Sequence, residues 1–152
     1  MMIVREATKE DLKILLEFEQ GMVAAERPFD STLIEGEIHY YDLDYLIDSP
    51  NATVMVAEED HQVVASGYAL IKKAAKQYYN FEEYAYLGFM FVRPEYRGRG
   101  INQLILDQLL EWTKSKGISE VRLDVYDQNE SAVKAYEKAG FEPLFLTMRL
   151  KV

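Results

Sequence analysis

One part of the sequence limits the fold more than any other, because an apolar run, a basic loop and an amphipathic run follow one another directly. Residues 81–92 are rich in aromatic side chains and predict a β-strand. Five apolar residues then recur at helical spacing: Ile101, Leu104, Ile105, Leu109 and Trp112. A strand, a tight loop and a helix in this order predict an α/β fold in which the helix packs back onto a sheet.

The remaining periodicity extends this unit to the order β-αα-βββ-α-β-α-β. Helix starts are expected at Thr8, Thr32 and Asn129, and helix ends at Gly117 and Gly140. The other strands are expected at residues 2–6, 53–57, 63–71, 121–126 and 144–152. We therefore expect one domain over residues 1–152, with a mixed α/β sheet of six to seven strands flanked by about four helices.

Composition excludes several classes of function. The chain has no cysteine, which rules out a disulfide framework, a thiolate metal site and a Cys nucleophile. Its two histidines, His39 and His61, lack metal-ligand spacing, so no metal is expected. No apolar run reaches membrane-spanning length and the N-terminus is charged from the start. We therefore expect a cytoplasmic protein without a membrane partner.

Charge is spread unevenly along the chain. Residues 1–60 carry a net charge of −11 and residues 61–152 a net charge of +2, which together give −9. Because an acidic surface repels polyanions and attracts cations, nucleic acid is not an expected partner.

A basic loop stands out against this acidic background. Arg97, Gly98, Arg99 and Gly100 lie between the expected strand and the expected helix. Free amides at a helix N-terminus favour an anion, glycines allow the backbone to approach it closely, and arginines add charge-assisted bonds to phosphate. The loop is neither a P-loop nor a dinucleotide fingerprint, since GxxxxGK[ST] is absent and Gln103 stands where a small residue is needed.

Two spaced motifs make the chain resemble the GCN5-related N-acetyltransferase (GNAT) family. The first, (Arg/Gln)-x-x-Gly-x-(Gly/Ala), runs from Arg97 to Asn102, with Asn102 in place of the final small residue. The second consists of Asn129, Tyr136 and a Lys-Ala-Gly-Phe end at 138–141. The segments IVREATKEDL and VMVAEEDHQVVASGYAL are also similar to this family, so the resemblance covers nearly the whole chain. It implies a sheet that splays between its fourth and fifth strands, with acetyl-CoA in the cleft.

The resemblance implies which residues hold acetyl-CoA. The main chain of Met90, Phe91 and Val92 would pair with the pantetheine arm like an added strand. The pyrophosphate would be held by the loop and the first helical turn: Arg97, Gly98, Arg99, Gly100, Ile101, Asn102 and Gln103. Asn129 would hydrogen-bond the cofactor, and it is also a favourable helix N-cap. Since the amide of Asn102 stays available and its side chain can donate to phosphate, we interpret the loop as a variant of the motif.

The resemblance also implies a general acid and a general base. Tyr136 would protonate the leaving thiolate of coenzyme A, although its spacing alone favours a core tyrosine. An acceptor ammonium must lose a proton before it attacks, and Asp124 matches a position where some members place the base. Many members carry an acid on the fourth strand, where this chain has Gly88 and Phe89. The alternatives to Asp124 are Glu82, Glu83 or a chain of water molecules.

The acceptor is expected to be a cationic amine. Seven acids lie in the segment that shapes the acceptor side in this family: Glu26, Asp30, Glu35, Glu37, Asp42, Asp44 and Asp48. Six tyrosines could line a wall with cation–π capacity: Tyr40, Tyr41, Tyr45, Tyr78, Tyr79 and Tyr86.

The sequence thus predicts an acetyl-CoA-dependent N-acetyltransferase that moves the acetyl group to a primary amine by direct attack in a ternary complex. An acyl-Cys intermediate is excluded. Two alternatives stay open: a non-catalytic CoA-binding or regulatory module of the same fold, and a transferase that uses another acyl-CoA. A C-terminal strand with a free edge could also pair across a homodimer.

Overall fold

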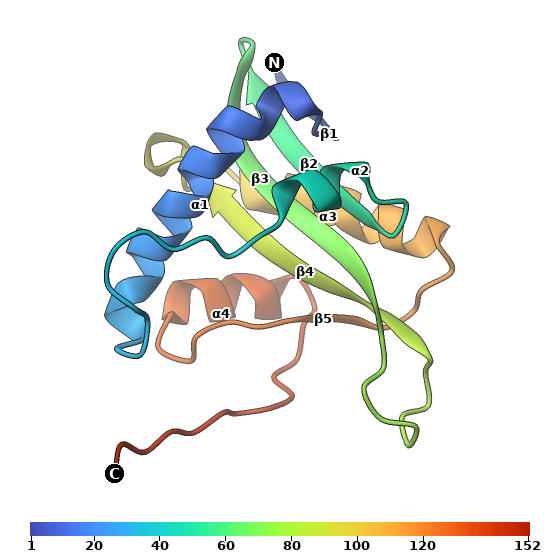
Figure 1. Ribbon diagram of the computed structural model, residues 1–152. Coiled ribbons are helices and arrows are strands. Elements are labelled where there is room, and N and C mark those ends of the chain that lie inside the picture. Colours follow the sequence, from blue (N-terminus) through green and yellow to red (C-terminus); the bar gives the residue numbers. More distant parts are fainter.

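The computed structural model describes residues 1–152 and contains five strands and four α-helices (Figure 1). In chain order these are β1 (Met2–Glu6), α1 (Leu12–Glu26), α2 (Leu43–Asp48), β2 (Ala52–Glu59), β3 (Gln62–Lys73), β4 (Glu83–Val92), α3 (Ile101–Ser115), β5 (Val121–Leu123) and α4 (Glu130–Lys138). Three short 3₁₀ turns join them: η1 (Lys9–Asp11), η2 (Arg27–Phe29) and η3 (Pro94–Tyr96). The expected hairpin, the long central helix and the helix that starts at Asn129 are therefore confirmed.

The strands form one mixed sheet in the order β1-β2-β3-β4-β5. The first four strands pair antiparallel, whereas β5 runs parallel to β4. Helices α1 and α2 cover one face of the sheet and α3 covers the opposite face (Figure 1). None of the helices combines the length and the apolar character needed to cross a membrane.

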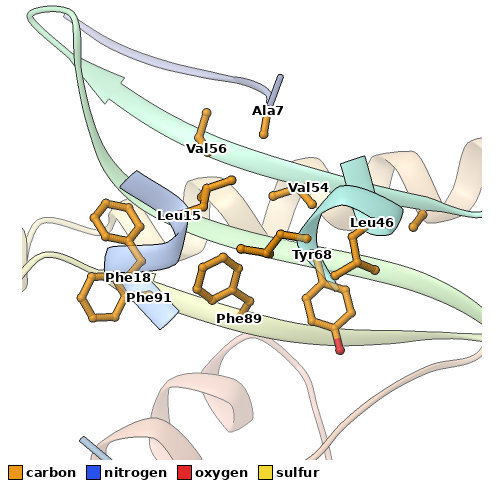
Figure 2. Close-up of a cluster of buried hydrophobic side chains, with 11 residues drawn as sticks. Ala7, Leu15, Phe18, Leu46, Val54, Val56, Tyr68, Phe89 and Phe91 are labelled. Carbon is orange, nitrogen blue, oxygen red and sulfur yellow. The ribbon is translucent and has the colours of Figure 1, made fainter. Parts of the chain in front are cut away.

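An apolar cluster fills each face of the sheet. Below α1, Leu15 and Phe18 pack on strand residues that include Val56 and Phe91, and the Phe18 and Phe91 ring centroids are 4.8 Å apart (Figure 2). Below α3, the predicted stripe supplies Ile101, Ile105 and Leu109 to the cluster, with Trp112 packed against it, whereas Leu104 is exposed. The amphipathic patterning of α1 and α3 therefore fixes which side of each helix meets the sheet.

A β-bulge interrupts β4 at its middle. Ser66 of β3 faces Phe91 and Tyr68 faces Gly88, so two residues of β4 oppose one residue of β3. Phe89 lies within the bulge with φ 57°, a left-handed conformation that costs a bulky residue about 1–3 kcal/mol. The buried Ser66 Oγ donates to the Phe89 carbonyl oxygen at 3.0 Å and holds the bulge in place.

The helix expected to start at Thr32 does not form, and that prediction was wrong. The Asp30 carboxylate accepts the Thr32 N–H at 2.9 Å in a local turn, and Gly36 has φ 88°. Residues 30–42 form an irregular connection, and the helix begins only at Leu43 behind its N-cap Asp42.

Side chains of α1 and η2 replace the helical hydrogen bonds of this 30–42 connection. Gln20 Nε2 donates to the Ile38 carbonyl oxygen at 2.8 Å, and Arg27 Nη1 donates to the Ile34 carbonyl oxygen at 2.8 Å. Because backbone polar groups must be satisfied somewhere, these distant partners allow the connection to stay non-helical.

The last strand expected at 144–152 is also absent, which explains why the sheet has five strands instead of six to seven. Residues after α4 contain neither helix nor strand, and Figure 1 shows them extending away from the other elements. The chain leaves α4 through Gly140 with φ 106° and a Phe141 N–H bond to the Tyr136 carbonyl oxygen at 3.0 Å. This helix cap sets the exit direction away from β5.

Asp11 links β1 to the start of α1 and generates a stability prediction. Its carboxylate accepts from Arg5 Nη1 at 2.9 Å, from Arg5 Nη2 at 3.0 Å and from the Thr8 N–H at 2.8 Å. We expect Asp11→Asn to lower the free energy of unfolding by about 2 kcal/mol at pH 7, since it removes a partly buried ion pair and an N-terminal cap. Urea denaturation measures this loss.

The same contacts predict acid sensitivity. Arg5 lowers the pKa of Asp11 below its ordinary value of 3.8, so the carboxylate stabilises the fold above that value and the gain is lost as pH falls through the lowered pKa. Wild type should therefore lose more stability than Asp11→Asn in this acid range. Asp48→Asn, which removes only an exposed contact to Lys9, is the control. If Asp11→Asn lost as much stability in this acid range as wild type and Asp48→Asn, the role of Asp11 would be contradicted.

Candidate active site

The edge of β4 that faces β5 has no partner strand in the second half of β4. Strand β5 pairs with β4 only from Ala85 to Leu87, through Val121 to Leu123. The following residues, Gly88 to Val92, have no strand neighbour on that side, so alternate N–H and C=O groups of this edge are open to an extended partner. The splay expected between the fourth and fifth strands is therefore present.

The residues expected to pair with pantetheine lie on this open edge. Phe91 is buried in the α1 cluster, whereas Met90 and Val92 pack against the α3 cluster. Their side chains therefore belong to the core, and only their main chain is available for a ligand. The Val92 carbonyl oxygen accepts from Arg97 Nε at 3.1 Å.

The basic loop turns from β4 into α3 through two left-handed glycines. Gly98 has φ 79° and Gly100 has φ 76°, and a Cβ at either position would meet nothing within 4 Å. These positions need glycine for their backbone conformation, not for space. Leu104 N–H bonds the Gly100 carbonyl oxygen at 3.3 Å, so the amides of the first turn of α3 before it face outward without backbone acceptors.

Several side chains of this loop and of the first helical turn are bound to other residues of the chain. Arg99 Nη1 lies 3.5 Å from Glu59 Oε2 and its guanidinium stacks on the Tyr96 ring at 4.9 Å. Gln103 Nε2 donates to Asp107 Oδ1 at 2.8 Å, and Ile101 is buried in the α3 cluster. The anion-binding capacity of the loop therefore rests on its amides, with Asn102 half-buried in the first turn.

Asn129 caps α4 as predicted. Its Oδ1 accepts from the Ala132 N–H at 3.4 Å and from Ser131 Oγ at 3.3 Å. The helix that it starts carries Tyr136, whose ring meets the Phe141 ring edge-on at a centroid distance of 5.8 Å. Burial raises the pKa of Tyr136 to about 12, with a smaller contribution from the Glu26 carboxylate. The phenol therefore stays protonated at neutral pH and can act as a donor.

Asp124 directly follows β5 and is exposed. Its Oδ2 accepts a hydrogen bond from the Tyr86 hydroxyl at 3.0 Å. No hydrogen bond joins Asp124 to Tyr136, and the carboxylate that acts on Tyr136 is Glu26. The two predicted catalytic residues thus lie on different elements, and each has its own neighbours: Tyr86 binds Asp124, whereas Glu26 lies near Tyr136.

The structure explains why β4 carries no acid at Gly88. A Cβ at this position would lie 2.4 Å from Cε1 of the Tyr68 ring. Tyr68 sits at the edge of the α1 cluster with its hydroxyl pointing away from the aliphatic side chains (Figure 2). An aromatic ring therefore occupies the space of the missing carboxylate. Glu82 and Glu83 are exposed at the start of β4.

A group of tyrosines joins the 30–42 connection to the sheet. The Tyr41 ring lies 5.5 Å from Tyr68 and 4.8 Å from Phe89, and Tyr68 lies 6.3 Å from Tyr86, between ring centroids. Burial raises the pKa of Tyr41 well above its ordinary range and that of Tyr68 to about 12. Burial and the neighbouring Glu26 carboxylate together raise the pKa of the Tyr40 phenol to about 12.

Two of the seven acids expected on the acceptor side face these tyrosines. Burial raises the pKa of Glu26 above its ordinary value, and nearby Asp30 raises it further. The Tyr126 hydroxyl donates to Asp30 Oδ2 at 2.7 Å, and the Tyr126 ring stacks on Phe29 at 6.0 Å. These contacts dock the end of α1 onto the β5–α4 loop. The other five acids point elsewhere: Glu35, Glu37, Asp42, Asp44 and Asp48 are exposed, cap α2, or pair with Lys9 or His39.

A fully buried carboxylate positions the tyrosines. Glu19 Oε2 accepts from the backbone N–H groups of Tyr40 and Tyr41, each at 2.9 Å. Glu19 Oε1 lies 2.8 Å from His39 Nδ1, and this contact raises the pKa of His39. Glu19 therefore fixes the backbone from which Tyr40 and Tyr41 reach the sheet.

Several residues of this site were missed by the sequence analysis. Glu19 appears in the sequence as one more acid on a solvated helix, and only its burial reveals its role. Tyr68 follows the alternation of a core strand, and Tyr126 lies outside the quoted motif. Among the six tyrosines considered, Tyr45 and Tyr78 are exposed, so they do not line this site.

A surface cleft of about 490 Å³ lies between α1 and residues 39–44. Its lining includes Tyr40, Tyr41, Asp42 and Asp44 from the expected acceptor side, but none of the residues expected to hold acetyl-CoA or to act as acid or base. The chemistry-bearing residues instead gather where β4 and β5 separate. Asp124, the free β4 edge and the Tyr68–Tyr86 pair lie at this separation, and the glycine loop follows the end of β4.

The chain is similar to known proteins in sequence and in fold. The sequence pattern of the Acetyltransferase (GNAT) family matches residues 20–141. The thialysine N-epsilon-acetyltransferase of Bos taurus is 41% identical over 59 residues, which cover 39% of this chain and 35% of that protein. The chain therefore matches only about a third of the length of this curated relative.

Solved structures share the fold over nearly the full length. A mutant of the BH1408 protein from Bacillus halodurans has a TM-score of 0.88 at 21% identity, over 99% of both chains. A predicted acetyltransferase from Clostridium acetobutylicum, solved with acetyl-CoA, has a TM-score of 0.75 at 23% identity, over 99% of this chain and 96% of the other.

The buried carboxylate provides a test of how the site is held together. We expect Glu19→Gln to lower the free energy of unfolding by about 3 kcal/mol, because an amide loses one charge-assisted acceptor and turns a donor toward N–H groups. Glu17→Gln, two residues away on the exposed side of α1, is the matched control and should change little. Chemical denaturation of both variants measures the difference, and a loss no larger than that of the control would contradict the role of Glu19.

Proposed function

The chain belongs to the GNAT acetyltransferase family, and from this premise we propose that it transfers the acetyl group of acetyl-CoA to a cationic primary amine. The observation that carries this proposal is the free edge of β4 followed by the glycine loop, together with a protonated tyrosine on α4. This combination offers main-chain pairing for an extended thioester arm, amides for a diphosphate and a donor for a leaving group.

We assign cofactor contacts to the residues named from the motifs. The main chain of Met90, Phe91 and Val92 pairs with the pantetheine arm, and the outward amides between Gly98 and Gln103 hold the pyrophosphate. Asn129 adds a polar contact from the start of α4. The Clostridium acetobutylicum neighbour is described as solved with acetyl-CoA, which supports the choice of cosubstrate.

The residues of the site divide the proton transfers of the reaction. A carboxylate takes one proton from the acceptor ammonium, and the free amine attacks the thioester carbonyl carbon. The C–S bond then breaks as the N–C bond is completed, and the Tyr136 phenol donates to the departing sulfur. The nitrogen loses its second proton as the amide forms, and this proton restores the Tyr136 phenol. The products are the acetamide, coenzyme A and the proton taken by the carboxylate, which is released to solvent. The attack is direct, since the chain contains no cysteine to form an acyl-thioester.

Two carboxylates suit the role of base. Asp124, the residue predicted from the sequence, borders the open edge and already binds the Tyr86 hydroxyl. Glu26 lies near Tyr136 and has a raised pKa, which brings a carboxylate closer to the range of an effective base. We propose that Asp124 accepts the proton and that Glu26, with Asp30, attracts the ammonium.

The acceptor chemistry follows from the charges and rings around this region. Glu26, Asp30 and Asp124 supply negative charge, and the tyrosines supply ring faces for a cation. The bovine relative bears the name of an enzyme that acetylates the ε-nitrogen of thialysine, and a lysine-like amine is therefore our first choice of acceptor.

The non-catalytic alternative draws on a single observation, the ring of Tyr68 where β4 would carry an acid. It predicts binding of acetyl-CoA without any amine-dependent release of coenzyme A. A transferase for a larger acyl group predicts turnover that is faster with that thioester than with acetyl-CoA.

Tyr136→Phe tests the proposed acid. We expect kcat to fall by about 10²-fold, because the leaving thiolate loses its proton donor. Acetyl-CoA should still raise the Tm of the variant as it does for wild type, by several degrees at about 100 times Kd. Tyr78→Phe, on the exposed β3–β4 hairpin, is the control. An unchanged kcat in Tyr136→Phe would remove this residue from the mechanism.

A pair of amide substitutions separates the two carboxylates. Asp124→Asn should lower kcat, and raising the pH should restore part of the rate, since a larger share of the acceptor then arrives as the free amine. Glu26→Gln should mainly raise KM for a cationic acceptor, by about tenfold, with kcat less affected. The reverse pattern in steady-state profiles over pH would exchange the two roles.

A further inference from the structure

The ring of His39 lies between two carboxylates. Its Nδ1 is 2.8 Å from Glu19 Oε1, and its Nε2 is 3.1 Å from Glu37 Oε1. A neutral imidazole carries a proton on only one nitrogen, so the other nitrogen would turn its lone pair toward a carboxylate oxygen. The geometry therefore requires the imidazolium, in which both nitrogens donate.

Glu19 depends on this positive charge. Its side chain is fully buried, and its Oε2 accepts the N–H groups of Tyr40 and Tyr41 at 2.9 Å. No lysine or arginine contacts Glu19, so His39 is its only cationic partner. A buried carboxylate is costly unless it is both paired and hydrogen-bonded. His39 therefore completes the pairing that keeps Glu19 on the two tyrosine amides.

The charged groups around His39 all favour the imidazolium. Its hydrogen bond to Glu19 is the largest cause of a pKa raised above 6.5, and the charges of Glu19 and Glu37 act in the same direction. Two further acids line the same cleft from the start of α2, but both bind elsewhere: Asp42 caps α2 and Asp44 pairs with Lys9. The His39 side chain is 55% exposed, so its proton exchanges freely with solvent.

The backbone held by Glu19 carries two tyrosines of the proposed acceptor region. The Tyr41 ring contacts the rings of Tyr68 and Phe89, and the Glu26 carboxylate acts on the Tyr40 phenol. The neighbouring carbonyl group at position 38 is held by the side-chain amide of Gln20, which does not titrate. Residues 39–41 are therefore the part of the connection whose attachment depends on a proton.

We propose that His39 is a positioning residue for the acceptor side, and that its imidazolium, together with Glu19 and Glu37, forms a clamp that holds residues 39–41 against α1. Loss of the proton at alkaline pH turns a lone pair toward a carboxylate and releases the backbone of Tyr40 and Tyr41. The clamp itself does not rest on the proposed function, whereas its effect on the binding of an amine does.

The pH range of the clamp follows from the direction of the shift. Because the pKa of His39 is raised in the folded chain, the stability that the clamp contributes is fully present below pH 6.5 and is lost as pH rises through the raised pKa. An acceptor amine needs the opposite change, since it attacks only after losing its proton. The clamp therefore works against the chemical step on the alkaline side.

NMR titration of the full chain tests the clamp without any ligand. The chain has two histidines, so the spectrum of His39→Gln identifies the ring signal of His39. We expect this signal to titrate above pH 6.5 in wild type and at lower pH in Glu37→Gln, which removes one of the two carboxylates. Titration at or below pH 6.5, or no change in Glu37→Gln, would overturn the proposal.

Amide hydrogen exchange measures the release directly. After correction for the intrinsic pH dependence of exchange, protection of the Tyr40 and Tyr41 amides should fall as pH rises through the His39 titration. Linkage fixes the size of the fall at about tenfold for each unit by which the clamp raises the pKa of His39. Val56, buried at the centre of the sheet, is the control and should keep its protection. Protection of Tyr40 and Tyr41 that stays constant would show that no clamp exists.

Steady-state kinetics with lysine tests the link to the acceptor. The KM of His39→Gln should exceed that of wild type by about tenfold below pH 6.5, with kcat little changed, and the ratio should approach one as His39 loses its proton. Titration of lysine itself cancels in this ratio. His61→Gln, on the exposed β2–β3 turn, is the matched control.

The outcomes separate the two proposals. A KM ratio that does not vary with pH would overturn the role of His39 in acceptor binding. If no amine is acetylated at all, the proposed function fails, while the titration and the exchange of the Tyr40 and Tyr41 amides still decide whether the clamp exists.

Discussion

The bulge in β4 is the constraint on which the site depends. Upstream of it, Leu87 faces the α3 cluster, whereas beyond it Phe89 and Phe91 face α1. The extra residue thus reverses which positions of β4 support which helix. The positive φ of Phe89 costs free energy, which the Ser66 hydrogen bond and a fully buried ring offset. Because β5 leaves β4 just before the bulge, the strand edge opens at the point where its twist changes.

The opposite wall of the site depends on buried polar contacts and not on secondary structure. The 30–42 connection is held by Glu19, Gln20 and Arg27, each bonding backbone groups 7 to 22 residues away. This leaves the tyrosines on a segment that is rigid through hydrogen bonds without being a helix. Acidic groups at the end of α1 then face them. The chain thus combines a basic loop, which suits an anion, with a separate pair of acids, Glu26 and Asp30, which suits a cation.

The sequence predicted the parts of the fold that local rules decide. The strand–loop–helix unit from β4 to α3, the hairpin of β2 and β3, the left-handed glycines and the Asn129 cap all follow from patterns within a few residues. The candidate loop and Tyr136 came from motif spacing, and the structure gives Tyr136 a raised pKa. Their roles in binding and catalysis stay predictions.

The features that the sequence analysis missed or predicted wrongly depend on partners far away in the sequence. Thr32 looked like a helix start, but α1 and η2 side chains satisfy that backbone instead. Nothing in the residues next to Glu19 indicated that its side chain is buried. The bulge at Phe89 could be predicted only from the register in which β3 and β4 pair. Residues 144–152 have much of the alternation of a strand, yet the structure contains no strand there.

The measurement that tests the central claim most directly is release of free coenzyme A from acetyl-CoA in the presence of paired amines. Thialysine or lysine, a polyamine and a lysine peptide would each be matched with a neutral analogue of similar size. The account predicts release of coenzyme A with at least one cationic amine and little release with its neutral counterpart. The rate with the cationic amine should fall as added salt screens the charges of Glu26 and Asp30. Stabilisation by acetyl-CoA without release for any amine, or equal rates for charged and neutral acceptors, would contradict it.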